Sequence, residues 1–418
     1  MKLGGLVIDV TPVRASKPFR YVFAARAVSL LGIGLLVVAV PAQTYELTGS
    51  SLHVAGVATT LGVSVFVGSV AGGVLADRFE RRRTIQLARS AAGLSFLALG
   101  LNALLPEPSL AVIYVASAVD GLAGGVSGTT LMAVVPTLVG ERRLAAAGAM
   151  IALTTDVGTV VSPALAGLVI ASGGVALTYF VAAAATAVTV ALIVGLGPSP
   201  APGEHHEPPL RALVSGVRFA ARSGAVRSVL LVGVLVMLVG GPTVLLPALV
   251  DHVLAAGPST LGVLYAAPAV GALVGSLTSG WTGRIRRDGV VLLAAAALMS
   301  LGVAVAGLAT SVVVVVLGLA GHGLGRVITE VLGFALLQRN TPDELRGRVS
   351  SLWQMQAVAA TSVGSISAGL AGQWFPPDTA LLVYGTAGVV FTALAAAVST
   401  PLWRTPASDN PVTTREGA

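Results

Sequence analysis

Long apolar segments alternate with short polar ones along the whole chain. Each apolar segment has about 20 residues or more, enough for an α-helix to cross a bilayer core of about 30 Å. The pattern predicts an all-α integral membrane protein with twelve transmembrane helices, six in each half. The predicted spans are 20–45, 54–76, 84–104, 110–138, 145–171 and 176–197, then 226–252, 259–281, 289–308, 311–337, 346–374 and 379–402.

Arginine residues mark one side of the predicted bundle. Every second loop carries arginine, beginning with the loop from Arg78 to Arg83, whereas the intervening loops carry only acidic and neutral residues. Because short loops rich in arginine stay in the cytoplasm, we expect a multi-pass protein of the bacterial inner or plasma membrane with both termini cytoplasmic. Residues 1–17 lack the apolar core of a signal peptide, so we expect the first span to direct insertion.

The composition supports this class and narrows the chemistry. Hydrophobic residues make up 55% of the 418 residues and charged residues only 10%, whereas about a quarter of a soluble domain is charged. The net charge of +7 is spread over loops, so we expect no nucleic-acid partner. The sequence has no cysteine, no phosphate-binding G-x-x-x-x-G-K-[ST] loop and no cluster typical of an enzyme or a metal site. We therefore expect neither a cofactor nor enzymatic activity.

A polar stretch divides the chain into two halves. Its Pro-rich start, PSPAPGEHHEPP, predicts a cytoplasmic linker, and the arginines that follow at helical spacing predict a short amphipathic helix on the inner membrane surface. A solvated linker is the alternative. The predicted units are residues 1–197, 198–225, 226–402 and a cytoplasmic tail 403–418.

The two halves also have the features of a repeat. One constant shift along the chain places residues of the first half on identical residues of the second, at matching points of the two six-span blocks. Parallel halves of this kind are the layout of transporters that rock around a site near the membrane midplane. The matched pairs are Pro41 with Pro247, Arg78 with Arg284, Arg81 with Arg287, and Pro136 with Pro342.

The loop after the second span carries the most specific motif. Residues 73–82 match G-x-L-A-D-R-x-x-R-R in full, and in a twelve-span chain this resembles the major facilitator superfamily. Glycine permits close helix contact, the aspartate suits a facing helix N-terminus, and arginines anchor a loop at the inner surface. The resemblance implies a gate, for which a purely topological basic loop is the alternative. The gating residues are Gly73, Asp77, Arg78, Arg81 and Arg82. The second-half copy, residues 280–287, has Gly283 where the first has Asp77, so we expect it to be weaker.

A second motif lies in the fifth predicted span. Residues 158–167 resemble the G-x-x-x-G-P-x-x-G-G signature of exporters in the same superfamily, with Ser162 and Ala166 in place of two glycines. A proline among small residues bends a membrane helix and lets another helix approach closely. We therefore expect Gly158, Pro163 and Gly167 to form a hinge or a seal.

Ionisable residues inside the spans are the best candidates for function, because each is costly at that depth. Asp120 and Asp156 lie about 15 Å from their helix ends, close to the midplane of a core of about 30 Å. Neither has a partner on its own helix, so both are candidates for proton or substrate binding, with Arg26 as a possible counter-charge. Arg326 and Glu330 are one helical turn apart and can pair, which is also a purely structural interpretation.

Four further residues are candidates to line a central cavity. Phe334 and Trp353 would supply aromatic surface, and Gln354 and Gln356 would supply polar contacts, although aromatic residues at helical spacing more often serve packing.

A narrower resemblance covers nearly the whole chain. Phe19-Arg20, Val38 to Pro41, Leu101 to Leu110, Leu264 to Ala267 and Gln338 to Arg348 resemble the bacterial enterobactin exporter family. This implies export of a catecholate siderophore. The twelve-span layout and the carboxylates Asp120 and Asp156 lead us to expect alternating access driven by a proton gradient. The expected partners are a small-molecule substrate and the lipid bilayer, and we expect a monomer. The alternatives are multidrug or macrolide efflux, nutrient import, or a receptor without transport.

Overall fold

The computed structural model describes residues 11–140, 143–197, 217–278 and 288–398, and these are almost entirely helical. The first half contains α1 (Thr11–Ala15), α2 (Lys17–Thr48), α3 (Ser51–Arg78), α4 (Arg81–Ala103), α5 (Leu110–Val139) and α6 (Leu144–Val194). The second half contains α8 (Gly224–Leu238), the 3-10 helix η3 (Pro242–Leu245), α9 (Leu246–His252), α10 (Pro258–Leu277), α11 (Asp288–Leu308), α12 (Val312–Arg339), α13 (Asp343–Trp374) and α14 (Pro377–Val398).

The predicted linker, the second copy of the loop motif and the tail lie wholly or largely outside the described residues. Residues 217–222 are helical, but the start of the predicted amphipathic helix is not described. The unit boundaries and the placement of this helix on the membrane surface therefore stay predictions.

The described residues include all twelve predicted spans except the last residues of the eighth and twelfth, 279–281 and 399–402. Nine of their helices are long and apolar enough to cross a membrane. One of these, α6, holds two spans, because Gly174 interrupts its helical backbone with a φ of 75°. The remaining two spans are α13 and the broken segment formed by α8, η3 and α9. The predicted all-α fold with six spans in each half is thus confirmed.

The seventh span differs from the prediction of one continuous helix over residues 226–252. Helix α8 ends at Leu238, and the chain continues as the 3-10 turn Pro242–Leu245 before α9 begins at Leu246. The cause is local, because Gly240 and Gly241 have low helix propensity and Pro242 cannot donate a backbone hydrogen bond. Tyr384 of α14 donates its hydroxyl hydrogen bond to the Leu238 carbonyl oxygen, which supports the broken backbone.

Capping residues explain where the first spans begin and end. The Ser16 hydroxyl accepts a hydrogen bond from the Phe19 amide (3.3 Å), and Gly49 ends α2 with a left-handed φ of 59°. Between α4 and α5, the Asn102 side chain donates to the Ser109 carbonyl oxygen (3.1 Å) and accepts from the Ser109 amide (2.8 Å). These bonds close the loop whose sequence supports the narrower resemblance.

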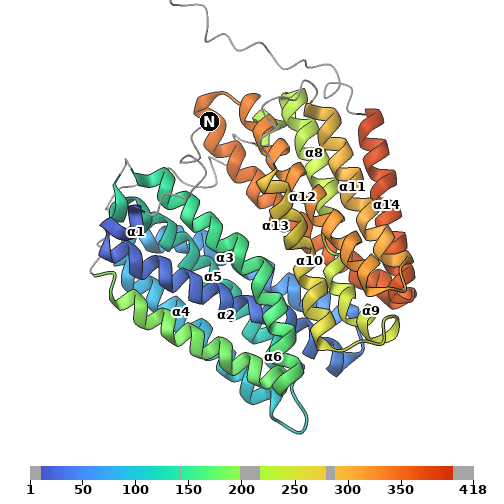
Figure 1. Cartoon of the computed structure of the whole chain (residues 1–418). Coiled ribbons are helices and arrows are strands. Elements are labelled where there is room, and N and C mark those ends of the chain that lie inside the picture. Colours follow the sequence, from blue (N-terminus) through green and yellow to red (C-terminus); the bar gives the residue numbers. More distant parts are fainter. Residues whose placement is uncertain (1–10, 141–142, 198–216, 279–287, 399–418) are drawn as a thin grey trace, which may run out of the picture.

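The helices form two bundles that meet at one end of the molecule. Figure 1 shows the first half, blue to green, meeting the second half, yellow-green to red, beside α6 and α10 and diverging from there. We call the end with residues 78–83 the basic end. We call the opposite end, where α3 begins at Ser51 and α13 ends at Trp374, the closed end.

The closed end is sealed by small residues and two hydrogen bonds. Gly167 of α6 and Gly262 of α10 pack so tightly that a Cβ on Gly167 would lie 2.8 Å from the Pro258 carbonyl oxygen. The side chains of Tyr45 and His252 share a hydrogen bond (2.9 Å, Oη to Nε2), and the Thr59 hydroxyl donates to the Ser362 carbonyl oxygen (3.4 Å). Both bonds join the two halves. Among the described residues, the hydrogen bonds between the halves are these two.

Candidate substrate cavity

A cavity of about 630 Å³ lies between the two halves. In the first half its walls come from the middle of α2 and of the first span in α6, and in the second half they come from the seventh span and from α10, α12 and α13. It extends to Ser276, next to the last residue of α10, and therefore reaches the basic end. The seal described above lies on its other side. The cavity therefore lies between the seal and the basic end and extends toward the basic end.

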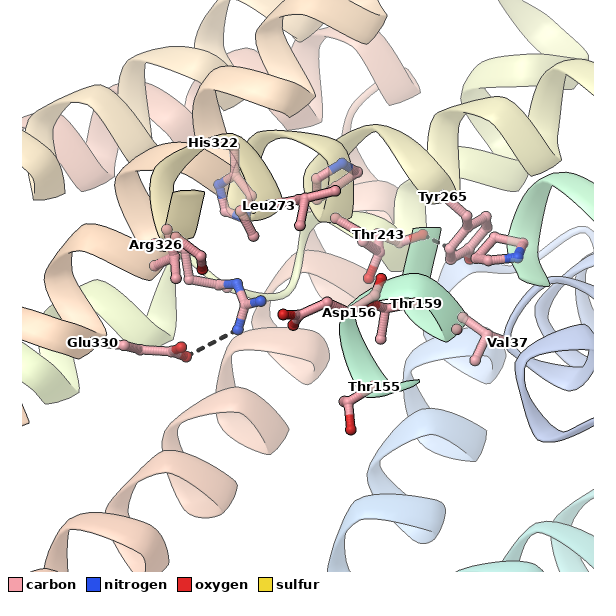
Figure 2. Close-up of a pocket in the computed structure, with 18 of the residues that line it drawn as sticks. Val37, Thr155, Asp156, Thr159, Thr243, Tyr265, Leu273, His322, Arg326 and Glu330 are labelled. Carbon is pink, nitrogen blue, oxygen red and sulfur yellow. Dashed lines mark hydrogen bonds and ion pairs between the residues drawn. The ribbon is translucent and has the colours of Figure 1, made fainter. Parts of the chain in front are cut away.

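Three of the predicted charged residues line this cavity. Asp156 enters it from α6, and Arg326 and Glu330 enter it from α12 in the opposite half (Figure 2). The Arg326 guanidinium donates a hydrogen bond to the Glu330 carboxylate (Nη1 to Oε1, 2.9 Å), and both side chains remain partly exposed. The Asp156 carboxylate forms no hydrogen bond or ion pair with any described residue. One carboxylate of the cavity is therefore paired and the other is free.

His322 adds a hydrogen-bond acceptor to the cavity wall. The residue is only 3% exposed, and Nδ1 lies 3.1 Å from the Met299 carbonyl oxygen. Because a carbonyl oxygen only accepts, Nδ1 carries the hydrogen, so Nε2 of a neutral ring is an acceptor. His322 lies one turn before Arg326 on α12 and lines the cavity, although it was not among the predicted site residues.

Asp120 lies apart from this group. It lines a second cavity of about 180 Å³, most of whose walls belong to the first half, and is 9% exposed, with no hydrogen bond or ion pair to a described residue. The cation that acts on it electrostatically is Arg89 of α4, a residue that sequence reasoning missed. A signal was present, because Arg89 lies two turns inside α4 at a depth where charge is costly.

Arg26 does not pair with either aspartate, contrary to its predicted use as a counter-charge. Its Nη2 donates to the Thr155 hydroxyl (2.9 Å), which ties α2 to α6 one residue before Asp156. Its Nε is buried without a hydrogen-bond partner among described residues. Arg26 and Arg89 line a polar cavity of about 30 Å³, so the two guanidiniums share one small space.

Of the four aromatic and amide residues predicted to line the cavity, some do so and others do not. Trp353 lines the large cavity and is 6% exposed. Phe334 is 39% exposed and does not line it, and neither does Gln356, whose Nε2 is buried without a described partner. The prediction that Phe334 and Gln356 face the cavity is wrong for this conformation, because their sides of α12 and α13 point elsewhere. Gln354 lies on α13, and its side chain is outside the described residues.

The motif of the fifth span serves both the cavity and the seal. Gly158 and Pro163 line the cavity, and Ser162 donates its hydroxyl hydrogen bond to the Gly158 carbonyl oxygen. Gly167, nearly one turn beyond Pro163, packs against Gly262 at the closed end. A seal at this motif therefore has a structural counterpart, whereas hinge motion stays a prediction.

The predicted gating residues Gly73 and Asp77 make no contact with the described residues of the second half in this conformation. A Cβ on Gly73 would meet no atom within 4 Å, and the close contact expected there is made instead by Gly72 against Val126 of α5. Asp77 is half-buried and forms no hydrogen bond or ion pair with a described residue, while its neighbour Arg78 is exposed. The cause is the separation of the halves at the basic end, which leaves this face of α3 without a partner helix.

The arginines that follow have separate roles. Arg81 is buried and donates to the Ala76 and Ala133 carbonyl oxygens (3.3 and 2.9 Å), which fixes the loop against α5. Arg82 and Arg83 form ion pairs with Glu80 (3.4 and 2.8 Å). Arg81 therefore anchors the loop whether or not Asp77 is engaged.

Two bundles of six spans around a central cavity, sealed at one end, define the class of secondary transporters that work by alternating access. The chain belongs to the Major Facilitator Superfamily, whose family description matches residues 22–364 and 229–417. It is a multi-pass membrane transporter.

Particular relatives are similar over most of their length. The enterobactin exporter EntS of Shigella boydii is 38% identical over 371 residues, which is 89% of each chain, and EntS of Escherichia coli has the same identity and coverage. Among solved structures, the nucleoside transporter NupG superposes with a TM-score of 0.73 at 12% identity, covering 93% of this chain and 99% of NupG. A peptide transporter of the POT family superposes with a TM-score of 0.72 at 14% identity, covering 93% and 95%. These structures support the fold only.

Proposed function

We propose that this protein exports an enterobactin-like siderophore from the cytoplasm across the bacterial inner membrane. The observation that carries the proposal is the 38% identity to enterobactin exporters over 89% of both chains. The specific motifs behind the resemblance are spread over both halves rather than confined to one loop. The substrate assignment therefore rests on whole-length similarity.

The geometry is consistent with the inward-facing state of such an exporter. The arginine-rich loop of residues 78–83 lies at the end where the halves diverge, and the positive-inside rule assigns this end to the cytoplasm. On this assignment the termini are cytoplasmic, and the cavity takes substrate from the cytoplasm while Tyr45, Gly167 and His252 seal the outside. Rocking of the halves would then open the closed end and bring a facing helix to Asp77.

Proton coupling is the second part of the proposal. Asp156 is the carboxylate of the large cavity without a described partner, and it stands across from the Arg326–Glu330 pair (Figure 2). A proton on Asp156 would remove the negative charge that a substrate donor otherwise binds. We infer that a bound proton and a bound substrate exclude each other at this residue, so that proton uptake accompanies substrate release, which makes the exporter an antiporter.

Transport in everted membrane vesicles tests the proposal. Vesicles that contain the full chain should accumulate labelled enterobactin when a proton gradient, acid inside, is imposed, and an uncoupler should abolish the accumulation. Vesicles without the protein are the control. Accumulation that an uncoupler does not change would contradict proton coupling, and the absence of any accumulation would contradict the substrate.

Multidrug efflux is the second candidate, and the apolar wall of the cavity favours it. Leu30, Ile33, Val37 and Leu273 are among the lining residues, so an apolar drug would also be accommodated. A deletion strain distinguishes the two. We expect reduced siderophore secretion under iron starvation with unchanged resistance to dyes and macrolides, and the opposite pattern would favour drug efflux.

A further inference from the structure

A narrow pocket lies beside the large cavity, mostly within the first half. We call the cavity of about 180 Å³ that contains Asp120 the side pocket. Ile33, Val37, Thr243 and Tyr265 line both spaces, so the side pocket adjoins the large cavity and shares these side chains as a wall. Its other walls are aliphatic residues of α2, α3, α4 and α5. They include Leu36, Val40, Val54, Val57, Ala58, Leu61, Leu99 and Ala116.

The polar groups of the side pocket are few and are grouped on α5. Asp120 is its one charged residue, and Ser117 lies one turn earlier on the same helix. Their side chains are 9% and 5% exposed, and neither forms a hydrogen bond with a described residue. Tyr265 is different, because its hydroxyl donates to the Thr243 carbonyl oxygen (2.9 Å) and leaves only the ring facing the space. The pocket therefore offers apolar walls and one unsatisfied acceptor group.

An unsatisfied carboxylate inside an apolar pocket is costly unless a ligand donates to it. Arg89 acts on Asp120 electrostatically but forms no ion pair with it, so the carboxyl oxygens remain open to a donor from a ligand. Apolar walls exclude hydrated ions, and the Asp120 charge repels anionic groups. What fits is an uncharged ring with hydrogen-bond donors at one edge.

Two further considerations narrow the ligand class. A space of about 180 Å³ accommodates one substituted six-membered ring but not a molecule that would fill the neighbouring 630 Å³. A phenolic hydroxyl is more acidic than an alcohol and therefore donates more strongly to a carboxylate. Both considerations favour a hydroxylated aromatic ring that enters while the rest of its molecule stays in the large cavity.

We propose that the side pocket binds one hydroxylated aromatic ring of the transported molecule, with Asp120 and Ser117 contacting the ring hydroxyls. This rests on the proposed function, in which the ring is one catechol of the siderophore. It adds a residue-level reason for selectivity, because a ring with methylated hydroxyls has no hydrogen to donate. It also predicts that Asp156 and Asp120 act on different parts of one substrate.

Binding of small probes to the full-length protein in lipid nanodiscs tests the pocket directly. Radiolabelled catechol should bind, and 1,2-dimethoxybenzene, which keeps the ring but lacks donors, should compete about tenfold less well. Asp120→Asn should weaken catechol binding about tenfold, and Ser117→Ala by a smaller factor. Ala58→Leu, which fills the pocket, should abolish binding. Ala111→Leu makes the same change at an exposed site on α5 outside both cavities and should leave it unchanged.

Several results would overturn the proposal. Equal binding of catechol and 1,2-dimethoxybenzene, unchanged affinity in Asp120→Asn, or tighter binding of a cationic benzylamine or of cyclohexane-1,2-diol would each contradict it. Enterobactin transport is measured on the same variants, so that a failure of the side-pocket proposal can be distinguished from a failure of the proposed function. Catechol binding without enterobactin transport would support the pocket and contradict the transported substrate. Enterobactin transport without catechol binding would contradict the pocket alone.

Discussion

The closed end and the basic end use the same kind of device, and only one of them is engaged. At the closed end, Gly167 meets Gly262 and Tyr45 bonds to His252 across the halves. At the basic end, Gly73 faces open space and Asp77 has no described partner. Small residues that permit close contact and a polar group that fixes it are thus present at both ends. The difference indicates that one seal forms as the other opens.

The largest effect is expected where bulk is added to the engaged seal. Gly167→Val places a branched side chain where even a Cβ would lie 2.8 Å from the Pro258 carbonyl oxygen, so the closed end cannot close. We expect export in everted vesicles to be abolished. Gly124→Val is the matched control, because a Cβ on Gly124 meets no atom within 4 Å. Normal export by Gly167→Val would show that this contact is not needed.

A smaller but still large effect is expected at the unpaired carboxylate of the cavity. Asp156→Asn keeps the shape and removes the titrating group, so proton-driven export should fall about tenfold or more, while exchange of substrate across the membrane continues. The measurement compares gradient-driven accumulation with counterflow in the same vesicles. Glu107→Gln, in an exposed loop, should change neither. Unchanged gradient-driven accumulation by Asp156→Asn would contradict proton coupling at this residue.

A moderate effect is expected at the disengaged end. Asp77→Asn should leave membrane insertion intact and reduce export about threefold to tenfold, because a carboxylate near a helix N-terminus is worth about 0.3–2 kcal/mol. Immunoblotting of membranes reports insertion, and vesicle transport reports function. Export at the normal rate would reduce the motif to a topological anchor, the role that Arg81 already serves.

The smallest effect is expected from the bond between Tyr45 and His252. Tyr45→Phe removes a hydrogen bond worth about 1 kcal/mol net, and His252 is largely exposed, so export should change only about twofold to threefold. The expected change is a shift of the population toward the state that is open at the closed end. Accessibility of the cavity to a membrane-impermeant reagent from the outside would measure this shift, and an unchanged accessibility would speak against the bond as part of the seal.

The fold could be predicted from the sequence because the bilayer imposes one rule on every span. Each apolar run must be a helix of bilayer length, so the twelve spans, and even the break near Gly174, follow from local composition. The interruption of the seventh span at Gly241 and Pro242 was missed, although its residues signal it. The segment is apolar throughout, so it was predicted as one helix although Gly241 and Pro242 disfavour helix within it.

The site could be predicted only in part, because depth along a helix is a local property and rotation about the helix axis is not. Depth identified Asp120, Asp156, Arg326 and Glu330. The direction in which a side chain points around its helix axis decides that Trp353 lines the cavity while Phe334 does not. This direction depends on how the helix packs against other helices. Depth along α4 could also have identified Arg89, but its relation to Asp120 joins two helices and could not be predicted from either one alone.

Paired distance measurements test the alternation of the two ends most directly. The sequence has no cysteine, so spin labels can be introduced without background. Leu87→Cys with Leu277→Cys reports the basic end, and Leu104→Cys with Leu308→Cys reports the closed end, all at exposed positions. When siderophore and acidic pH are applied to the protein in nanodiscs, the first distance should shorten and the second should lengthen in the same fraction of molecules. If the first shortens while the second stays fixed, or if both change in the same direction, the two seals do not alternate and the account is wrong.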